Sequence, residues 1–313
     1  MTVEKRALGS SGIEVAPLAL GGNVFGWTAD EATSFDILDA FVAAGGNMVD
    51  TADVYTAWIP GHKGGESETV IGNWMRRDPA KRERVVVATK VGFLEGLAPD
   101  KIASACDASL QRLGIDTIDL YYHHKDDTNV PLADSLGAVD ALVKAGKVRA
   151  IGLSQYSAER LDEAMKTAEA NGLTKPTVLQ TWYNLVERPK LEGPMRDNAL
   201  AHGLGIVPFY GLANGFLTGK YRSKEDLDKS TRGMRNVEYL EGRGPRVLQA
   251  MDRIADETGA ALATIAIAWS NAQPGITSTL ASATSVSQLE ESLAALNFSL
   301  TPEQLRLLDE ASA

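Results

Sequence analysis

The sequence predicts an α/β fold, a single (β/α)8 TIM barrel that takes in residues 1–313. Eight short β-branched or apolar runs alternate with eight amphipathic segments, and strict alternation of strand and helix gives a parallel sheet. Gly21 and Gly22 follow the first run, without the third glycine and the helix of a G-x-G-x-x-G turn, which weakens the open doubly wound alternative. Barrels of this class routinely use this much chain for one domain.

The chain opens with a segment that predicts a small β-hairpin. Arg6–Leu8 and Ile13–Val15 flank the turn residues Gly9–Gly12. A hairpin ahead of the first barrel strand could plug the bottom of the barrel.

The predicted strands are runs rich in valine, isoleucine and tyrosine, which favour a pleated, buried surface. They are Val15–Leu20, Met48–Asp50, Val85–Lys90, Thr117–Tyr122, Val148–Leu153, Val178–Tyr183, Gly205–Tyr210 and Ile276–Leu280.

The predicted helices lie between these strands and carry apolar residues at helical spacing. They are Asp30–Ala44, Glu66–Arg76, Pro99–Leu113, Leu132–Ala145, Ala158–Ala170, Pro194–His202, Pro245–Thr258 and Val286–Ala294. Thr28, Ser157 and Ser285 are suited to N-caps, and glycines follow several helix ends. A further apolar stretch near residues 260–268 is too short to span a bilayer and predicts a buried helix.

Two long segments, Ala52–Gly65 and Leu212–Gly244, do not fit the repeat. Each follows a predicted strand, so both are expected on the rim of the barrel where the carboxyl ends of the strands meet. Loops of this length in a compact domain are usually functional.

Composition excludes several classes of function. The net charge is −10 and no basic stripe occurs, which argues against a nucleic-acid partner. The first residues lack the apolar core of a signal peptide, and a single cysteine, Cys106, permits no internal disulfide. We expect a cytoplasmic protein that makes no membrane contact.

Polar residues gather where predicted strands end, and in a barrel such ends converge on one site. Asp50 ends one strand, Tyr55 lies just beyond it, Lys90 ends the next strand, and His123 and His124 follow the one after. A buried lysine needs a carboxylate, which Asp50 can supply. A tyrosine against that ammonium would have a lowered pKa and could donate a proton to a carbonyl, while an imidazole orients the carbonyl oxygen.

The alternative interpretation is that Asp50 and Lys90 form only a structural ion pair and that Tyr55 packs a loop. The spacing of these residues does not distinguish the catalytic interpretation from the structural one. His123 should point away from His124 along a continuing strand, so we expect it to pack rather than to catalyse.

The same segments resemble the aldo-keto reductase superfamily over essentially the whole chain. The matching motifs are D-T-A-x-x-Y at Asp50–Tyr55, the lysine strand at Ala88–Gly92, D-L-Y-x-x-H at Asp119–His124, G-x-S-N-x-S at Gly152–Ser157, Q-x-x-Y-N-L at Gln180–Leu185, L-L-T-G-K-Y at Phe216–Tyr221 and Q-L-E-E-N at Gln288–Ser292. The Phe216–Tyr221 match is typical of the bacterial and potassium-channel-β-like branches.

The resemblance implies a catalytic tetrad: Tyr55 as general acid, Lys90 and Asp50 tuning it, and His124 orienting substrate. It also implies NADP(H) as cofactor, with NAD as the alternative. Amide side chains would hold the carboxamide, Tyr210 would stack on the nicotinamide, the Gly215–Lys220 loop would wrap the pyrophosphate, and the last helix would line the adenosine. The implied cofactor residues are Gly22, Asn23, Asp50, Ser154, Gln155, Gln180, Tyr210, Gly211, Leu212, Gly215, Leu217, Gly219, Lys220, Arg232, Ser282, Thr284, Gln288, Glu291 and Ser292.

The sequence departs from the family pattern at four of these positions. Gln155 and Ser292 stand where asparagine is usual, Gly211 where serine is common, and Thr284 where many members have arginine. A phosphate dianion needs paired cationic donors. Only Lys220 and Arg232 are evident for a 2′-phosphate, so the changes weaken a strict NADP preference.

The expected substrate is a small carbonyl compound or alcohol, bound against Phe25, Trp27 and Trp58, with Trp182 as a further candidate. The expected assembly is a monomer or a homo-oligomer. The competing function is a cofactor-binding regulator with little turnover, like potassium-channel β subunits. A metal-dependent barrel hydrolase fits poorly, since the chain has four histidines and no H-x-H after its first strand; no metal is expected.

Overall fold

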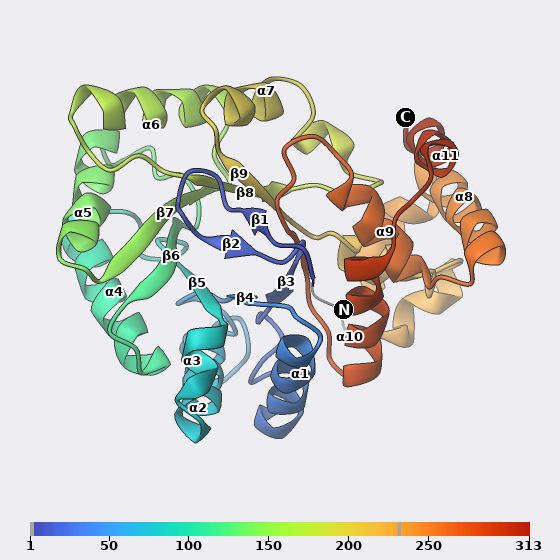
Figure 1. Ribbon diagram of the computed structural model, residues 1–313, viewed down its shortest axis with the longest axis horizontal. Coiled ribbons are helices and arrows are strands. Elements are labelled where there is room, and N and C mark those ends of the chain that lie inside the picture. The colour runs from blue at the N-terminus through green and yellow to red at the C-terminus, as the bar shows by residue number, and fades with distance from the viewer. Residues whose placement is uncertain (1–2, 231–232) are drawn as a thin grey trace.

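A computed structural model describes residues 3–230 and 233–313, and within them eight parallel strands form a nearly closed (β/α)8 barrel (Figure 1). The predicted fold class is confirmed. Seven strands follow one another in chain order around the sheet, and the last strand pairs with the first. They are β3 (Leu18–Gly21), β4 (Met48–Asp50), β5 (Val86–Val91), β6 (Ile118–His123), β7 (Val148–Ser154), β8 (Val178–Trp182), β9 (Gly205–Phe209) and β10 (Thr279–Ala281). The ring closes where Ile206 of β9 forms a parallel bridge with Ile276.

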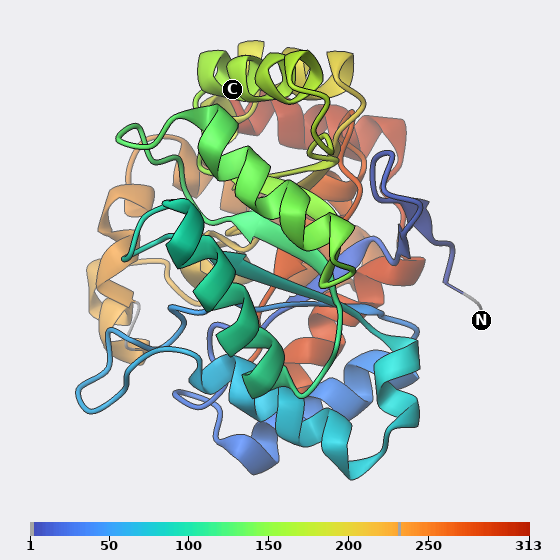
Figure 2. The ribbon, with the colours of Figure 1, turned by 90° about the vertical axis from the view of Figure 1, so that its left-hand side faces the viewer.

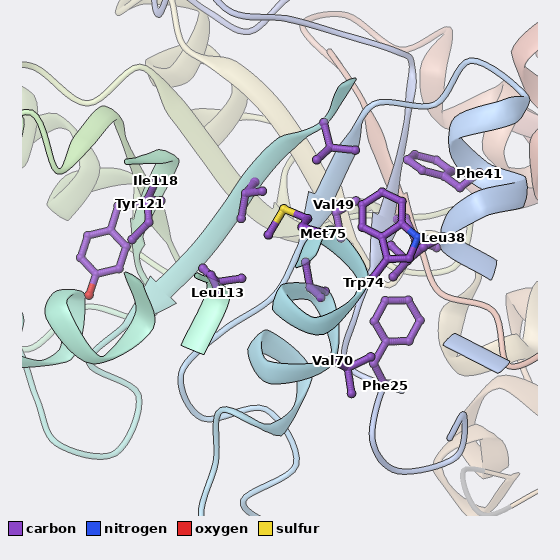
Figure 3. Packing of buried hydrophobic residues seen from close by; sticks show 14 of the residues in the cluster. Phe25, Leu38, Phe41, Val49, Val70, Trp74, Met75, Leu113, Ile118 and Tyr121 are labelled. Atoms are coloured by element: carbon purple, nitrogen blue, oxygen red, sulfur yellow. The ribbon is translucent and has the colours of Figure 1, made fainter. Parts of the chain in front are cut away.

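Helices cover the outside of the strands and bury an apolar layer against them (Figure 1). They are α1 (Glu31–Ala43), α2 (Glu66–Arg77), α3 (Ala80–Arg84), α4 (Pro99–Leu113), α5 (Leu132–Lys144), α6 (Ala158–Ala170), α7 (Pro194–Ala201), α8 (Arg243–Thr258), α9 (Leu262–Asn271), α10 (Val286–Leu293) and α11 (Pro302–Ser312). Figure 3 shows part of this layer, with Trp74 and Met75 of α2 packed near Val49 of β4. No helix within residues 3–230 and 233–313 has the length and apolar character that crossing a membrane requires.

The predicted hairpin forms from β1 (Arg6–Ala7) and β2 (Glu14–Val15) and covers one end of the barrel. Leu8, Ile13 and Val15 are buried in one cluster with side chains from the barrel interior, among them Met48 and Leu120. Figure 1 shows the hairpin across the centre of the ring, and Figure 2 shows it on the opposite side of the molecule from the long loops. The other end, where the strands finish, is therefore the end available for a site.

Alternation along the strands sorts side chains between two cores. On β5, Val86 and Ala88 belong to the interior cluster, whereas Val87 and Val91 pack outward under the helices. Lys90 shares the inward phase of Ala88, and Thr89 shares the outward phase of Val87. This phase places the Lys90 side chain inside the mouth of the barrel.

Several predicted boundaries were wrong. The first barrel strand begins at Leu18 rather than Val15, because Val15 pairs with Arg6 in the hairpin. The last strand is Thr279–Ala281, and Ile276 makes only an isolated bridge. Asp30, not Thr28, caps α1 by accepting a 2.8 Å hydrogen bond from the Thr33 amide. Ser157 and Ser285 cap α6 and α10 as predicted.

The chain has more helical structure than the repeat predicted. α3 and α11 were missed, and α9 matches the buried apolar helix expected near residues 260–268. The long segment after β9 contains the short 3-10 helices η2 (Ala213–Thr218), η3 (Lys224–Lys229) and η4 (Gly233–Leu240). Such short turns carry too few residues to produce a periodic pattern.

Candidate active site

The four predicted catalytic residues meet at the carboxyl end of the barrel. Lys90 is fully buried and forms an ion pair with Asp50 at the end of β4. Its ammonium also donates to the carbonyl oxygen of Thr51 at 2.7 Å and to the hydroxyl oxygen of Tyr55 at 2.9 Å. An ammonium has three hydrogens. Each of the three hydrogens therefore has an acceptor, and one of them is donated to the phenol oxygen of Tyr55.

The Tyr55 hydroxyl is held between the ion pair and His124. It lies 3.3 Å from an Asp50 carboxylate oxygen, to which it can donate, and the ring centroids of Tyr55 and His124 are 5.9 Å apart. Because the phenol oxygen already accepts from Lys90, its own hydrogen can turn either to Asp50 or to an incoming acceptor.

The pKa of Tyr55 is shifted in the direction opposite to the one predicted. Burial raises it well above 10, and the neighbouring charge of Asp50 raises it further. The Lys90 ammonium alone would lower the pKa of Tyr55, but the paired Asp50 carboxylate offsets that positive charge. Tyr55 is consequently a protonated phenol at neutral pH. Burial lowers the pKa of Lys90, and Asp50 opposes that effect.

His124 is a neutral imidazole. Burial lowers its pKa well below 6.5, and the charges of Lys90 and Lys125 lower it further. Its Nδ1 is buried and has no hydrogen-bond partner among the described residues. The ring of Phe93, whose centroid is 4.8 Å away, covers one side. His123 packs as predicted: its Nδ1 lies 3.0 Å from the hydroxyl of Tyr156 in the buried layer.

Two amides that were predicted to bind a carboxamide have partners within the site. Gln180, inside β8, donates to the second oxygen of Asp50 at 2.8 Å. Gln155 donates to the carbonyl oxygen of His124 at 3.0 Å. Ser154 is buried at the end of β7 in register with Gln180. Spacing gave no signal for the Gln180–Asp50 bond, because it joins positions 130 residues apart across the barrel.

Backbone in the left-handed region gathers on the same rim. Within the described residues, the non-glycine positions with positive φ are Thr56, Gln155, Tyr210, Ala213 and Asn214, all in loops that follow barrel strands or at their ends. Such conformations cost about 1–3 kcal/mol each and persist where the surroundings fix them. At Tyr210 the surroundings include Asn184, whose amide donates to the Tyr210 carbonyl oxygen at 2.9 Å.

The predicted cofactor residues after β9 line one stretch of this rim. Tyr210 packs against Trp182, with ring centroids 4.2 Å apart, and Leu212 precedes η2. In η2 the left-handed residues Ala213, Asn214 and Gly215 follow one another. The others on this stretch are Gly211, the buried Leu217, and Gly219, which ends η2 in a left-handed conformation. Arg232 lies outside the described residues.

A cation lies over this loop. The Lys220 ammonium would be 3.0 Å from a Cβ placed on Gly215, so the lysine lies directly against this glycine, whose positive φ favours glycine. The side-chain oxygen of Asn214 is buried and has no partner within the described part of the chain. Backbone amides in successive left-handed residues, beside a cation, form the kind of concavity that binds phosphate oxygens. These residues fit the pyrophosphate of a dinucleotide.

The predicted adenosine residues lie in α10 and in the segment between β10 and α10, next to the chain that follows β3. Ser282 donates to Asn23 at 2.7 Å, and Thr284 donates to Gln288 at 3.0 Å. Gly22 donates its amide to the Asp50 carbonyl oxygen at 2.8 Å, which ties this joint to the catalytic strand. Glu291 is exposed, whereas Ser292 is buried.

The predicted substrate residues separate into two groups. Trp27 and Trp58 form an edge-to-face pair with centroids 5.9 Å apart, and Trp58, which is 49% exposed, continues to Tyr55 at 6.3 Å. Phe25 is 0% exposed and packs near Val70 in the outer core (Figure 3). The assignment of Phe25 to the substrate pocket therefore stays a prediction. Phe93, beside His124, was missed, although it closely follows Lys90 in the chain.

Comparison with known proteins adds a second line of evidence. The model of the aldo/keto reductase family matches residues 17–313. An uncharacterized oxidoreductase, YrpG, of Bacillus subtilis is 32% identical over 98% of this chain and 95% of its own length. A probable voltage-gated potassium channel subunit beta of Arabidopsis thaliana is 31% identical over 94% of this chain and 92% of its own length. An aldo-keto reductase of Strobilurus tenacellus is 31% identical over 97% of this chain and 87% of its own.

Proposed function

The chain belongs to the aldo/keto reductase family, and we propose that it is an NAD(P)H-dependent enzyme that interconverts a small carbonyl compound and its alcohol. The observation that carries the proposal is the hydrogen bond from the buried Lys90 ammonium to the Tyr55 hydroxyl at 2.9 Å, with His124 beside it. This arrangement supplies a proton donor at the open end of the barrel.

Tyr55 acts as the general acid in carbonyl reduction. As the carbonyl carbon gains hydride, its oxygen becomes an alkoxide, which is a far stronger base than a phenolate. A phenol with a raised pKa therefore still transfers its proton downhill. The hydrogen bond from Lys90 stabilises the phenolate that forms, and Asp50 keeps the ammonium charged in its buried position.

His124 orients the carbonyl oxygen toward Tyr55. A neutral imidazole donates one hydrogen bond without competing for the proton that Tyr55 transfers. The low pKa of His124 keeps it in this form across the neutral range. Gln155 supports the backbone of His124 from the next strand.

A bound reduced nicotinamide would supply the hydride. The residues proposed to hold it are Ser154, Gln155 and Gln180 at the amide, Tyr210 at the ring, the loop from Leu212 to Lys220 at the pyrophosphate, and Ser282, Thr284, Gln288 and Glu291 at the adenosine. NADP(H) is the proposed form on the family resemblance, with NAD(H) as the alternative. The Lys220 ammonium lies against the loop assigned to the pyrophosphate, a group that both forms carry.

The proposed substrate has a flat apolar or aromatic face. Trp27, Trp58, Tyr55, His124 and Phe93 form a continuous series of rings with centroid separations between 4.8 and 6.3 Å. Aromatic rings prefer edge-to-face or offset contacts with such a face. The exposure of Trp58 keeps this wall open to a ligand.

A cofactor-binding regulator with little turnover is the second candidate, favoured by the potassium-channel β relatives. One experiment separates the two. NADPH and NADH are titrated by quenching of tryptophan fluorescence, and aldehydes, ketones and secondary alcohols are then screened by nicotinamide absorbance. Repeated turnover supports the enzyme. Tight NADPH binding with no more than one turnover supports the regulator, and absence of binding to either nucleotide refutes both.

A further inference from the structure

A second group of charged side chains lies on the outer side of β5, behind Lys90. Glu68 of α2 is fully buried, and one of its carboxylate oxygens accepts from the hydroxyl of Thr89 at 2.6 Å. The other accepts from the guanidinium of Arg112 on α4 at 2.7 Å. A Cβ on Gly65 would lie 2.4 Å from that guanidinium, so the glycine gives Arg112 its path to Glu68.

Asp53 joins this group from the loop that also carries Tyr55. Its backbone amide donates to the carbonyl oxygen of Lys90 at 3.2 Å, which fixes Asp53 against the lysine's own strand. Its Oδ1 is buried and has no hydrogen-bond partner within residues 3–230 and 233–313. The hydroxyl of Tyr121, which belongs to the buried layer drawn in Figure 3, likewise has no partner among those residues.

Asp53 differs from the other two carboxylates of this group in its pairing. Asp50 is paired with Lys90, and Glu68 is paired with Arg112. Within residues 3–230 and 233–313, Asp53 is the carboxyl group of this neighbourhood that forms no ion pair of its own. Its ionised form would add an uncompensated negative charge to a buried region, which is costly.

Burial and the charges around Asp53 together place its pKa near neutral pH. Burial raises its pKa to about 7, and the Glu68 carboxylate raises it as well, while Arg112, a hydrogen bond from the Val54 backbone amide, and Lys90 act in the opposite direction. The charge of Asp53 in turn favours the ammonium form of Lys90. Tyr121 faces the same group from β6 and feels the charges of both Asp53 and Glu68.

We propose that Asp53 is a positioning residue that controls proton donation by Tyr55 through its charge on Lys90. With Asp53 neutral, the positive charge of Lys90 is offset by Asp50 alone and stabilises the phenolate that forms on Tyr55. With Asp53 ionised, a second negative charge opposes that phenolate and slows the transfer. This inference rests on the proposed reductase function.

The kinetic test is the pH profile of kcat/KM for carbonyl reduction. Tyr55 stays protonated and His124 stays neutral across the neutral range, so neither accounts for an inflection near pH 7. Wild type should lose kcat/KM as pH rises through about 7, by up to about tenfold for each unit by which ionised Asp53 raises the pKa of Tyr55. Asp53→Asn, which cannot ionise, should keep the high value and a flat profile, and Asp53→Glu should restore the inflection.

A matched control and a spectroscopic readout complete the test. Asp127 lies in another loop of the same rim, and its carboxylate oxygens accept hydrogen bonds from the Leu97 and Asn129 amides. Asp127→Asn removes this carboxylate and should leave the inflection of the kcat/KM profile in place. An inflection that survives in Asp53→Asn, or that disappears in Asp127→Asn, would overturn the proposal.

Infrared spectra show the C=O stretch of a protonated carboxyl group directly. Wild type should have such a band that disappears with a midpoint near pH 7, and Asp53→Asn should lack it. This band needs no turnover. A missing band therefore counts against the role of Asp53, whereas a present band with no reduction of any carbonyl counts against the proposed function.

Discussion

Replacing Asp50 with asparagine isolates the electrostatics of the site. Asparagine keeps the size of the side chain but removes the charge that compensates Lys90, which is 0% exposed. The ammonium would retain hydrogen bonds to the Thr51 carbonyl oxygen and the Tyr55 hydroxyl. Neither of these acceptors carries a charge, so the variant must either bury an unpaired ammonium or release a proton from Lys90.

The second route sets an upper limit on the loss of stability. The pKa of Lys90 in the unfolded chain is close to 10.5. Each pH unit below that value costs about 1.4 kcal/mol if the folded state must hold a neutral amine. At pH 7 the cost is therefore at most about 5 kcal/mol. Removing one partner of a buried pair usually costs about 3–5 kcal/mol, so the two figures agree.

The sign of the pH dependence follows from proton counts. In Asp50→Asn the folded state binds fewer protons than the unfolded state between pH 7 and 10.5, because the folded pKa of Lys90 is depressed. Stability should therefore rise with pH. Between pH 7 and pH 9 the recovery should reach about 2.7 kcal/mol.

Urea unfolding followed by tryptophan fluorescence measures these changes. Asp50→Asn should lose about 3–5 kcal/mol at pH 7 relative to wild type and should regain part of it at pH 9. The matched control is the double variant Asp50→Asn/Lys90→Met, which leaves no unpaired charge and should recover most of the loss at both pH values. If Asp50→Asn were as stable as wild type at pH 7, or if its loss were the same at pH 9, the electrostatic account of Lys90 would be refuted.

Three further predictions concern the barrel and its rim. Gly9→Ala would place a methyl group 2.1 Å from a backbone oxygen under the hairpin and should lower the free energy of unfolding in urea by about 2 kcal/mol or more. The control Gly12→Ala, whose methyl group would meet nothing within 4 Å, should lower it by only about 1 kcal/mol because of the positive φ. Equal losses would contradict the hairpin's role as a plug. Gln180→Leu removes a 2.8 Å hydrogen bond to the Asp50 carboxylate and should destabilise the fold by about 1.5–3 kcal/mol and lower kcat, and a neutral result on both would show that the bond contributes nothing. Trp58→Ala, at a position 49% exposed, should change stability by no more than about 0.5 kcal/mol but raise KM for aromatic carbonyls severalfold; unchanged KM for every accepted carbonyl would remove Trp58 from the pocket.

The fold and the meeting of the tetrad could be predicted from the sequence because both depend on repetition. Strict alternation of strands and helices leaves few topologies, and parallel strands present all their carboxyl ends on one side. Asp50, Lys90 and His124 each lie at or just after a strand end, so their proximity followed from the topology alone.

The rest depends on contacts that spacing does not encode. Whether Phe25 lies in the pocket or under it depends on how α2 packs on the chain after β3, and the bond from Gln180 to Asp50 crosses the barrel interior. The direction of the Tyr55 pKa shift depends on a balance between burial, one cation and one carboxylate, which requires coordinates. No pattern in the sequence indicated that Asp53 would be half-buried, with one carboxyl oxygen fully enclosed.

Replacement of Tyr55 with phenylalanine tests the central claim most directly, in a single-turnover experiment with NADPH bound. The account predicts that the variant binds NADPH nearly as well as wild type, by fluorescence titration, while the rate of nicotinamide oxidation on adding a reactive aldehyde falls by about 10²–10⁴-fold. A variant that binds NADPH and reduces the aldehyde at close to the wild-type rate would show that the proton comes from another group, and the mechanism built on the Lys90–Tyr55 hydrogen bond would be wrong.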